Sequence, residues 1–283
     1  AALSLAVILL TLAAMLSALS GIGRGIRWLS NLNMALSWLL LVIFIVFGAT
    51  AFAGEMFVSG LTEYLRAIPS MSVTIWDGGD TPTALALSDW QSAWTIFYWA
   101  WWIAFTPFVG LFLARVSQGR TIREYVVGAI LLPAMMCFAW FCIVGGTALD
   151  LELTGTADGT ILGADLSAQL FATVENLFAA DWVLPVATLC VVLLITYLVT
   201  SADSAVLVIN TIVSGGATDG IRPRHIVLWS ALLGLVIITL LFAGGMDALR
   251  SVMIIGALPF SAVMLFMLCA LVYAILADIK SSS

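Results

Sequence analysis

Charged residues are scarce in this sequence. Only 9% of its 283 residues are Asp, Glu, Lys or Arg, whereas 63% are hydrophobic. A soluble domain carries about a quarter charged residues, so the composition excludes a soluble protein and indicates an integral membrane protein. The net charge of −6 reflects acidic residues concentrated in two segments between apolar runs. We therefore expect no nucleic-acid partner.

Residues that build catalytic or metal sites are equally scarce. The single histidine is His225, and all four cysteines lie within apolar runs, where they are interpreted as small packing residues. The sequence contains no Cys-x-x-Cys pair, no Cys/His cluster, no Ser/His/Asp set and no pair of carboxylates placed for acid–base chemistry. We predict that the protein is not an enzyme, and we expect no disulfide, metal cluster or organic cofactor.

Long hydrophobic runs are abundant. A membrane-spanning helix needs about 20 apolar residues, and seven runs qualify: 1–20, 34–53, 91–114, 125–148, 182–213, 226–243 and 252–277. We predict an all-α membrane protein in which residues 1–283 form a single transmembrane domain. Because the chain starts within its first apolar run and without a Met, we expect it to be a fragment whose N-terminal helices are missing.

Basic residues indicate the orientation of these runs. With strict alternation, one side receives most of the ten Lys and Arg residues, namely Arg24, Arg27, Arg115, Arg120, Arg123, Arg222, Arg224 and Lys280. That side should be cytoplasmic and should include the C-terminus. The acidic segments 54–90 and 149–181 are then loops on the outer side. Apolar residues recur at helical spacing in GLTEYLRAIPSM, which predicts an amphipathic helix on the membrane surface within 54–90.

Aromatic residues crowd the 91–114 run, in the stretch FYWAWWIAFTPFVG (97–110). Helical spacing places one stripe of rings on a single face, with Trp102 beside it: Trp94, Phe97, Trp101, Phe105 and Phe108. Trp usually gathers at the membrane–water boundary, but these rings lie at mid-segment. A π-face suits a quaternary ammonium or sulfonium group, which has no N–H to donate. A packing stripe between helices is the alternative interpretation.

Hydroxyl groups gather in TYLVTSADSA (196–205). Thr200 and Ser201 follow Tyr197 by three and four residues, so on a helix both hydroxyls should approach the Tyr197 carbonyl. Three hard oxygen atoms suit a small cation such as Na⁺. The alternative is that the hydroxyls bond back to the preceding turn. Asp203 is an ionisable residue beside an apolar run, which makes it a functional hypothesis.

These blocks together resemble the betaine/carnitine/choline transporter (BCCT) family. The similarity is carried by SAWTIFYWAWWIAFTPFVGLFLARVSQGRTIREYVVG, with LSNLNM before it and VTSADSA after it. The resemblance implies a twelve-helix transporter with a LeuT-like five-plus-five inverted repeat, of which this chain would supply the last seven transmembrane helices. It also implies a multi-pass protein of the cell (inner) membrane and a homotrimer.

The resemblance further implies roles for individual residues. Trp101 and Trp102 match the aromatic box that holds a trimethylammonium group, Phe97 matches an aromatic gate, and Trp94 matches a residue on the outward path. Tyr197, Thr200 and Ser201 match one sodium site, and Phe108 matches a residue of a second. Phe105 departs from the family, where a third Trp is usual. Phe keeps a π-face but weakens the cation–π interaction, so the substrate stays open within its class.

The expected function is secondary import of a small quaternary-ammonium osmolyte or nutrient, glycine betaine or choline, with Na⁺ as the symported coupling ion. Within the class, the alternative is a sodium-independent antiporter or proton-coupled transporter of carnitine, ectoine or a sulfonium compound. Outside the class, the alternative is a receptor or channel with an aromatic cage.

Overall fold

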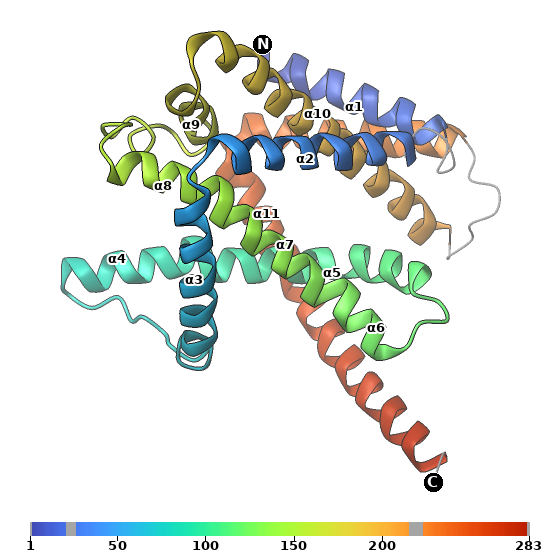
Figure 1. Cartoon of the computed structure of the whole chain (residues 1–283). Helices are drawn as coiled ribbons and strands as arrows, with labels where there is room; N and C mark the ends of the chain where they lie inside the picture. The colour runs from blue at the N-terminus through green and yellow to red at the C-terminus, as the bar shows by residue number, and fades with distance from the viewer. Residues whose placement is uncertain (1, 21–26, 215–222, 282–283) are drawn as a thin grey trace. The chain divides into compact units, whose positions relative to one another are not determined.

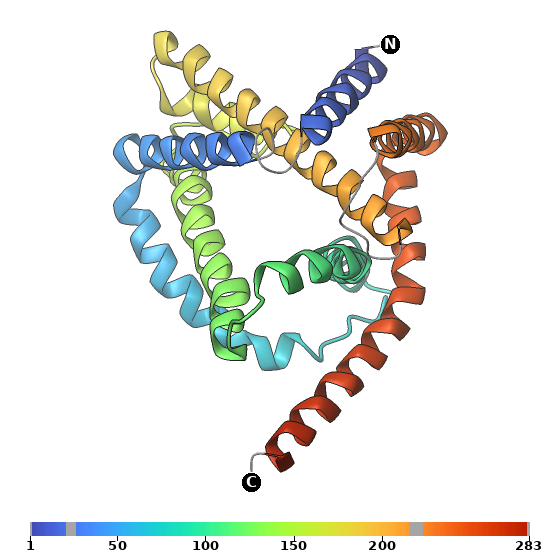
Figure 2. The ribbon, with the colours of Figure 1, turned by 90° about the vertical axis from the view of Figure 1, so that its right-hand side faces the viewer.

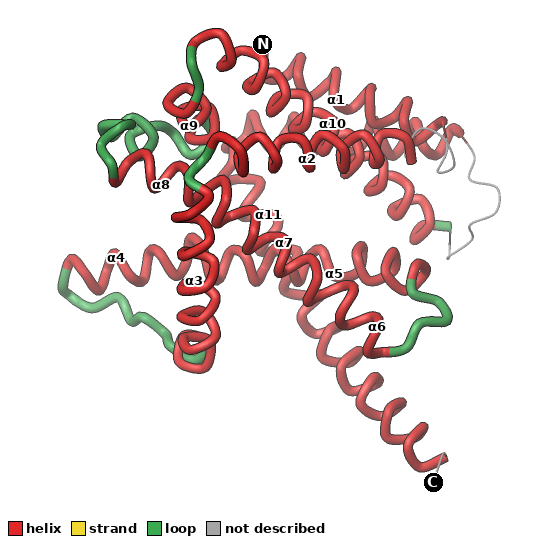
Figure 3. The backbone as a smooth tube through the Cα atoms, in the orientation of Figure 1, coloured by secondary structure: helices red, strands yellow, loops and turns green. Residues whose placement is uncertain are grey.

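The computed structural model describes residues 2–20, 27–214 and 223–281, apart from some side chains within the helices. The described residues form helices and connecting loops, without strands (Figure 3). Contacts divide the chain into unit 1 (Ala1–Val7, Val73–Gln118, Ala231–Ser283) and unit 2 (Ile8–Ser72, Gly119–Ser230). The helices are α1 (Ala2–Ser20), α2 (Arg27–Phe47), α3 (Thr50–Met71), α4 (Pro82–Trp90), α5 (Phe97–Val116), α6 (Ile122–Val126), α7 (Leu132–Trp140), α8 (Gly146–Leu153), α9 (Gln169–Leu177), α10 (Ala180–Val213) and α11 (Pro223–Ser281).

Five helices of the described chain are long and apolar enough to cross a membrane: Arg27–Phe47, Ile122–Leu153, Ala180–Val213, Pro223–Gly245 and Asp247–Asp278. They correspond to five of the seven predicted runs. The remaining two runs are helical as well, in α1, with a shorter apolar helix over Ser4–Ser20, and in the stretch that contains α5. The all-helical membrane class is thus confirmed, and the count of seven spans stays a prediction.

The core of unit 2 lies where α2, α9 and α10 meet. Its buried side chains are Leu40, Phe44, Val174, Val186, Cys190 and Leu193. α10 packs along α2, and the short α9 packs on α10. Burial of Phe44 and Val174, both 0% exposed, holds the short helix α9 against the two long helices through the hydrophobic effect.

The predicted C-terminal end of the second run, 34–53, was wrong. α2 stops at Phe47, and a new helix, α3, starts at Thr50. The break lies at Gly48 and Ala49, where the Thr147 hydroxyl accepts a bond from the Ala49 N–H at 3.2 Å. A side chain at Gly48 would collide with that hydroxyl. The sequence does not show this break, because the apolar pattern continues across it and the residue that contacts it, Thr147, is distant in sequence.

One long rod in unit 2 runs from α6 to α8 and is interrupted by two π-helical turns, η3 (Val127–Leu131) and η4 (Phe141–Gly145) (Figure 1). Pro133 is the second residue after η3 and has no N–H to offer the carbonyl of the preceding turn. A wider turn is one way in which a helix absorbs such a lost bond. The N-terminus of the rod is capped by Thr121 and Glu124, which bond each other's backbone N–H groups.

The two predicted outer loops contain short helices. Segment 54–90 holds most of α3 and all of α4, and α3 packs against α7 and α8. Tyr64 of α3 meets Phe138 edge to face at 5.2 Å, while Leu65 is largely exposed. In segment 149–181, the Glu152 carboxylate accepts three backbone N–H bonds and fixes the turn before α9. Placement of either segment on a membrane surface stays a prediction.

Unit 1 contains α4, the π turn η2 (Gln91–Ile96), α5 and most of α11. α11 bends at Gly244 and Gly245, and the bend is visible between its orange and red halves in Figure 2. Gly245 has φ +62 and ψ −139, a combination that side chains with a Cβ avoid. This glycine therefore separates two apolar helices that the sequence pattern also separates.

Candidate substrate and ion sites

Four aromatic residues of η2 and the start of α5 form a connected cluster of rings in unit 1: Trp94, Phe97, Tyr98 and Trp101. Trp94 stacks on Tyr98 with ring centroids 5.9 Å apart and planes 5° apart. Tyr98 lies 5.6 Å from Trp101, and Phe97 lies 6.1 Å from Trp101. Phe97 and Tyr98 meet edge to face at 5.5 Å. The predicted residues Trp94, Phe97 and Trp101 are thus joined through one further ring, that of Tyr98.

Tyr98 was not among the predicted site residues. The signal for it was present, because 94, 98 and 101 follow steps of four and three, which places them on one helical face. The prediction followed Phe97 instead. The π turn η2 widens the backbone under Trp94, and π-helical turns are frequent at functional sites.

The rings further along α5 are partly exposed. Trp101 is 43% exposed, Trp102 is 65% exposed and Phe105 is 42% exposed. Pro107 lies within α5 and denies a hydrogen bond to the carbonyl one turn earlier. The side chain of Phe108 lies outside the described residues. Trp101, Trp102 and Phe105 are therefore partly accessible at the surface of the described chain.

A cation already lies over one ring of this cluster. The guanidinium carbon of Arg250, on α11, is 5.2 Å from the centroid of the Phe97 ring. Asp247 is its partner in a loose ion pair of 3.9 Å. This distance lies within the range of about 6 Å in which a cation is attracted by the face of an aromatic ring.

The predicted ion ligands lie on α10 in unit 2. Thr200 Oγ1 is 3.0 Å from the Tyr197 carbonyl and 3.0 Å from the Thr196 carbonyl, so its single proton is shared between them. Asn33 Nδ2 of α2 donates to the same hydroxyl at 3.2 Å. The Ser201 side chain is exposed. Thr200 is thus beside the Tyr197 carbonyl, as its spacing predicts, and it also makes the back-bond of the alternative interpretation.

Asn33 is a neighbour that the sequence reasoning did not name as a site residue, although it lies in the LSNLNM block. It is 4% exposed, and its Oδ1 is buried without a hydrogen-bond partner. A buried carbonyl oxygen without a donor is costly. Next to a candidate cation site, such an oxygen is a fitting additional ligand, so the residues present fit a small hard cation.

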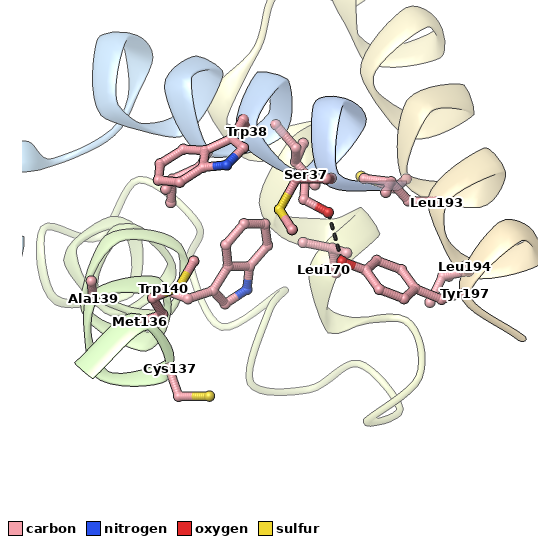
Figure 4. A pocket seen from close by; sticks show the side chains of 14 residues that line it. Ser37, Trp38, Met136, Cys137, Ala139, Trp140, Leu170, Leu193, Leu194 and Tyr197 are labelled. Atoms are coloured by element: carbon pink, nitrogen blue, oxygen red, sulfur yellow. Dashed lines mark hydrogen bonds between the residues drawn. The ribbon is translucent and has the colours of Figure 1, made fainter. Parts of the chain in front are cut away.

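Tyr197 adds a second link between α10 and α2. Its phenol oxygen is 2.7 Å from Ser37 Oγ. Because Ser37 donates its own proton to the Asn33 carbonyl at 2.7 Å, the phenol is the donor of this pair. The pair borders a cavity of about 610 Å³ whose wall includes Trp38, Trp140 and Tyr197 (Figure 4). The cavity is otherwise apolar and was not predicted from the sequence.

Asp203 of α10 is fully buried. Its carboxylate accepts a 2.5 Å bond from Ser17 of α1 and a 3.2 Å bond from Ser204. These two hydroxyls supply hydrogen bonds that a buried carboxylate needs. The sequence singled out Asp203 but gave no signal for Ser17, which is 186 positions away.

Known proteins resemble the chain over nearly its whole length. The family model of the betaine/carnitine/choline transporters matches residues 2–280. The chain is 37% identical over 267 residues to a glycine betaine transporter of Bacillus subtilis (94% of this chain, 50% of the relative). It is 38% identical over 263 residues to an ectoine/hydroxyectoine transporter of Virgibacillus pantothenticus (90% and 49%). It is 36% identical over 273 residues to an osmo-independent choline transporter of Acinetobacter baylyi (95% and 50%). The chain spans about half the length of these curated relatives.

Proposed function

Because the chain belongs to the betaine/carnitine/choline transporter family, a family of membrane transporters rather than enzymes, we propose that the full-length protein imports a small quaternary-ammonium osmolyte or nutrient together with Na⁺. Glycine betaine and choline are the proposed substrates. Relatives named as glycine betaine and choline transporters support this choice. The observation that carries the proposal is the connected cluster of the Trp94, Phe97, Tyr98 and Trp101 rings.

The onium group binds on the α5 stripe. Trp101, Trp102 and Phe105 provide the π-faces, and Phe97 and Trp94 provide rings along the access path. Each cation–π contact contributes about 0.5–2 kcal/mol, with the larger values where water is excluded. Because a trimethylammonium group cannot donate a hydrogen bond, aromatic faces distinguish it from primary amines that a carboxylate site would prefer. The ring contacts that join Trp94, Phe97, Tyr98 and Trp101 support a cluster of π-faces at this position.

Na⁺ binds at α10, through the Tyr197 carbonyl and the hydroxyls of Thr200 and Ser201. The unpartnered Oδ1 of Asn33 supports a hard cation at this position. A transporter alternates between two conformational states that open to opposite sides of the membrane. Bound Na⁺ would supply a positive charge that stabilises one of these states. If substrate and Na⁺ favour the same state, each raises the affinity for the other. Phe108 is proposed to line a second sodium site.

Ectoine is a second candidate substrate. The relative from Virgibacillus pantothenticus, at 38% identity, is named as an ectoine/hydroxyectoine transporter. Ectoine carries a delocalised cation, for which a π-face is again a suitable partner. Phe105, which replaces the third Trp of the family pattern, leaves more room beside the stripe. Both substrates would use the same residues.

We further propose a location in the cell (inner) membrane with the C-terminus in the cytoplasm, supported by the distribution of Arg and Lys. A homotrimer is proposed from the family resemblance. The outward acidic segments 54–90 and 149–181 would then contain α3, α4 and α9.

The test is substrate uptake by the full-length protein in proteoliposomes. Concentrative, saturable uptake of glycine betaine or choline that collapses without an inward Na⁺ gradient is expected. Uptake that persists without Na⁺ would indicate the antiporter or the proton-coupled alternative. Saturable binding without concentrative uptake would indicate a receptor or channel, and absence of both binding and uptake of onium compounds would overturn the proposal.

A further inference from the structure

Arg250 occupies a defined place beside the aromatic cluster of unit 1. It follows the Gly244–Gly245 bend and lies in the first turn of the second apolar helix of α11, Asp247–Asp278. Its guanidinium carbon is 5.2 Å from the Phe97 centroid. The distribution of basic residues places both this bend and the start of the 91–114 run on the outer side, so Arg250 and Phe97 would meet a substrate on its way in.

The charge of Arg250 is only weakly balanced. In the described part of unit 1, its ion pair is with Asp247, at 3.9 Å, and the two side chains are 50% and 91% exposed. A pair this long and this exposed contributes little free energy. The guanidinium therefore retains N–H donors that could bind a second, better-placed carboxylate.

The ring below Arg250 is continuous with the proposed onium site. Phe97 lies 6.1 Å from Trp101, whose face would hold the onium group. A bound onium and Arg250 are then two positive charges on neighbouring rings, and they repel each other. A substrate that carries its own carboxylate changes the sign of this interaction, because an Arg fork binds a carboxylate through two parallel hydrogen bonds.

We propose that Arg250 is a specificity-determining residue: it selects onium compounds that carry a carboxylate over onium alcohols, by pairing with the carboxylate while the onium lies on the α5 rings. The inference rests on the proposed function and deepens it by naming the substrate class of the site. It favours glycine betaine and other zwitterions over choline. Repulsion of the plain cation and attraction of the zwitterion both contribute to the preference.

The experiment compares three ligands on the full-length protein: glycine betaine, its methyl ester and choline. All three carry the same trimethylammonium group, and only the first carries a carboxylate. Equilibrium binding by the parent protein is expected to be about tenfold tighter for glycine betaine than for the ester. Equal affinity for the acid and the ester would overturn the proposal. Because this comparison uses only the parent protein, its outcome does not depend on whether a variant folds.

Arg250→Gln assigns the effect to this residue. The betaine-to-ester affinity ratio should fall about tenfold, with choline bound equally well or better. Arg250→Lys keeps the charge but loses the fork and should give an intermediate ratio. Asp247→Asn is the matched control: it removes the loose competitor for the guanidinium, so the ratio should stay constant or rise.

The outcomes separate this inference from the proposed function. If Arg250→Gln weakens all three ligands by the same factor, Arg250 acts by supporting the Phe97 ring and the specificity role is wrong. If the ratio is unchanged while onium binding persists, the specificity role is equally wrong and the proposed function stands. If the parent protein binds none of the three ligands, the proposed function itself fails.

Discussion

The aromatic stripe on α5 and the hydroxyl cluster on α10 differ in how many of their polar groups and surfaces already have partners within the described chain. The rings of Trp94, Phe97, Tyr98 and Trp101 contact one another, and Trp102 is 65% exposed in the described chain. On α10, Thr200 is bonded to two carbonyls and to Asn33, and Asp203 is fully buried between two hydroxyls. Removing a ring from α5 should therefore act mainly on ligand binding, whereas removing a hydroxyl from α10 also disturbs helix packing.

The largest effect is expected for Trp101→Ala. Loss of one dry cation–π contact of about 2 kcal/mol corresponds to about 30-fold in affinity, so saturable uptake should disappear at ordinary substrate concentrations. Uptake and equilibrium binding by the full-length protein measure this, with membrane expression as the check on folding. Trp99→Ala is the matched control, because Trp99 is on the same helix and 66% exposed. Equal apparent affinities in both variants would show that Trp101 only packs.

The next effect tests the hydroxyls of α10. The Thr200→Ala/Ser201→Ala double variant should raise the Na⁺ concentration for half-maximal uptake about tenfold, or about 1.4 kcal/mol. High Na⁺ should partly restore substrate affinity through the coupling between the sites. Uptake is measured against Na⁺ at fixed membrane potential.

The control for this variant is Thr196→Ala. Thr196 also bonds back to the preceding turn, at 2.8 Å from the Val192 carbonyl, but is not a predicted ligand. If the dependence of uptake on Na⁺ concentration is unshifted in the double variant, or shifts equally in Thr196→Ala, the sodium assignment is wrong and simple back-bonding is favoured.

An effect on stability rather than on transport is expected for Ser17→Ala. The variant removes the 2.5 Å donor to the buried Asp203 carboxylate, and an unsatisfied buried acceptor costs about 1–3 kcal/mol. The apparent Tm of the purified full-length protein should fall. Ser20→Ala, whose hydroxyl bonds only the Ser17 carbonyl in the described chain, should leave Tm nearly unchanged. Identical melting of both variants would contradict a supporting role for the Ser17–Asp203 bond.

The smallest effect concerns the departure from the family pattern. Phe105→Trp should change the ratio of uptake rates among glycine betaine, choline and ectoine by a few-fold, through a stronger cation–π contact and less room. Competition of each compound against labelled substrate measures the ratio, and Tm should stay close to the parent value. A variant that handles all three compounds like the parent would place Phe105 away from the substrate.

The spacing of residues within a single helix predicted several contacts in both the α5 stripe and the α10 cluster. The step of three from Tyr197 to Thr200 predicted the 3.0 Å approach of the hydroxyl to the carbonyl, because an α-helix fixes neighbours three and four residues apart. The same regularity predicted the contact of Phe97 with Trp101. It also accounts for the stacking of Trp94 on Tyr98, four residues further on, although the sequence analysis did not name Tyr98. No residue type in QSAWTI predicts the π turn found there.

Composition, apolar periodicity and the family blocks by themselves determined that this is an all-helical membrane protein of the betaine/carnitine/choline transporter family, because helix formation and hydrophobicity are local properties of the chain. Tertiary structure alone decided which distant partners complete each region: Arg250 over Phe97, Asn33 on Thr200, Ser17 on Asp203 and Thr147 at the Gly48 break. Each of these contacts joins residues about 100 or more positions apart. Their free energy depends on how helices pack, and no periodicity within one helix carries that information.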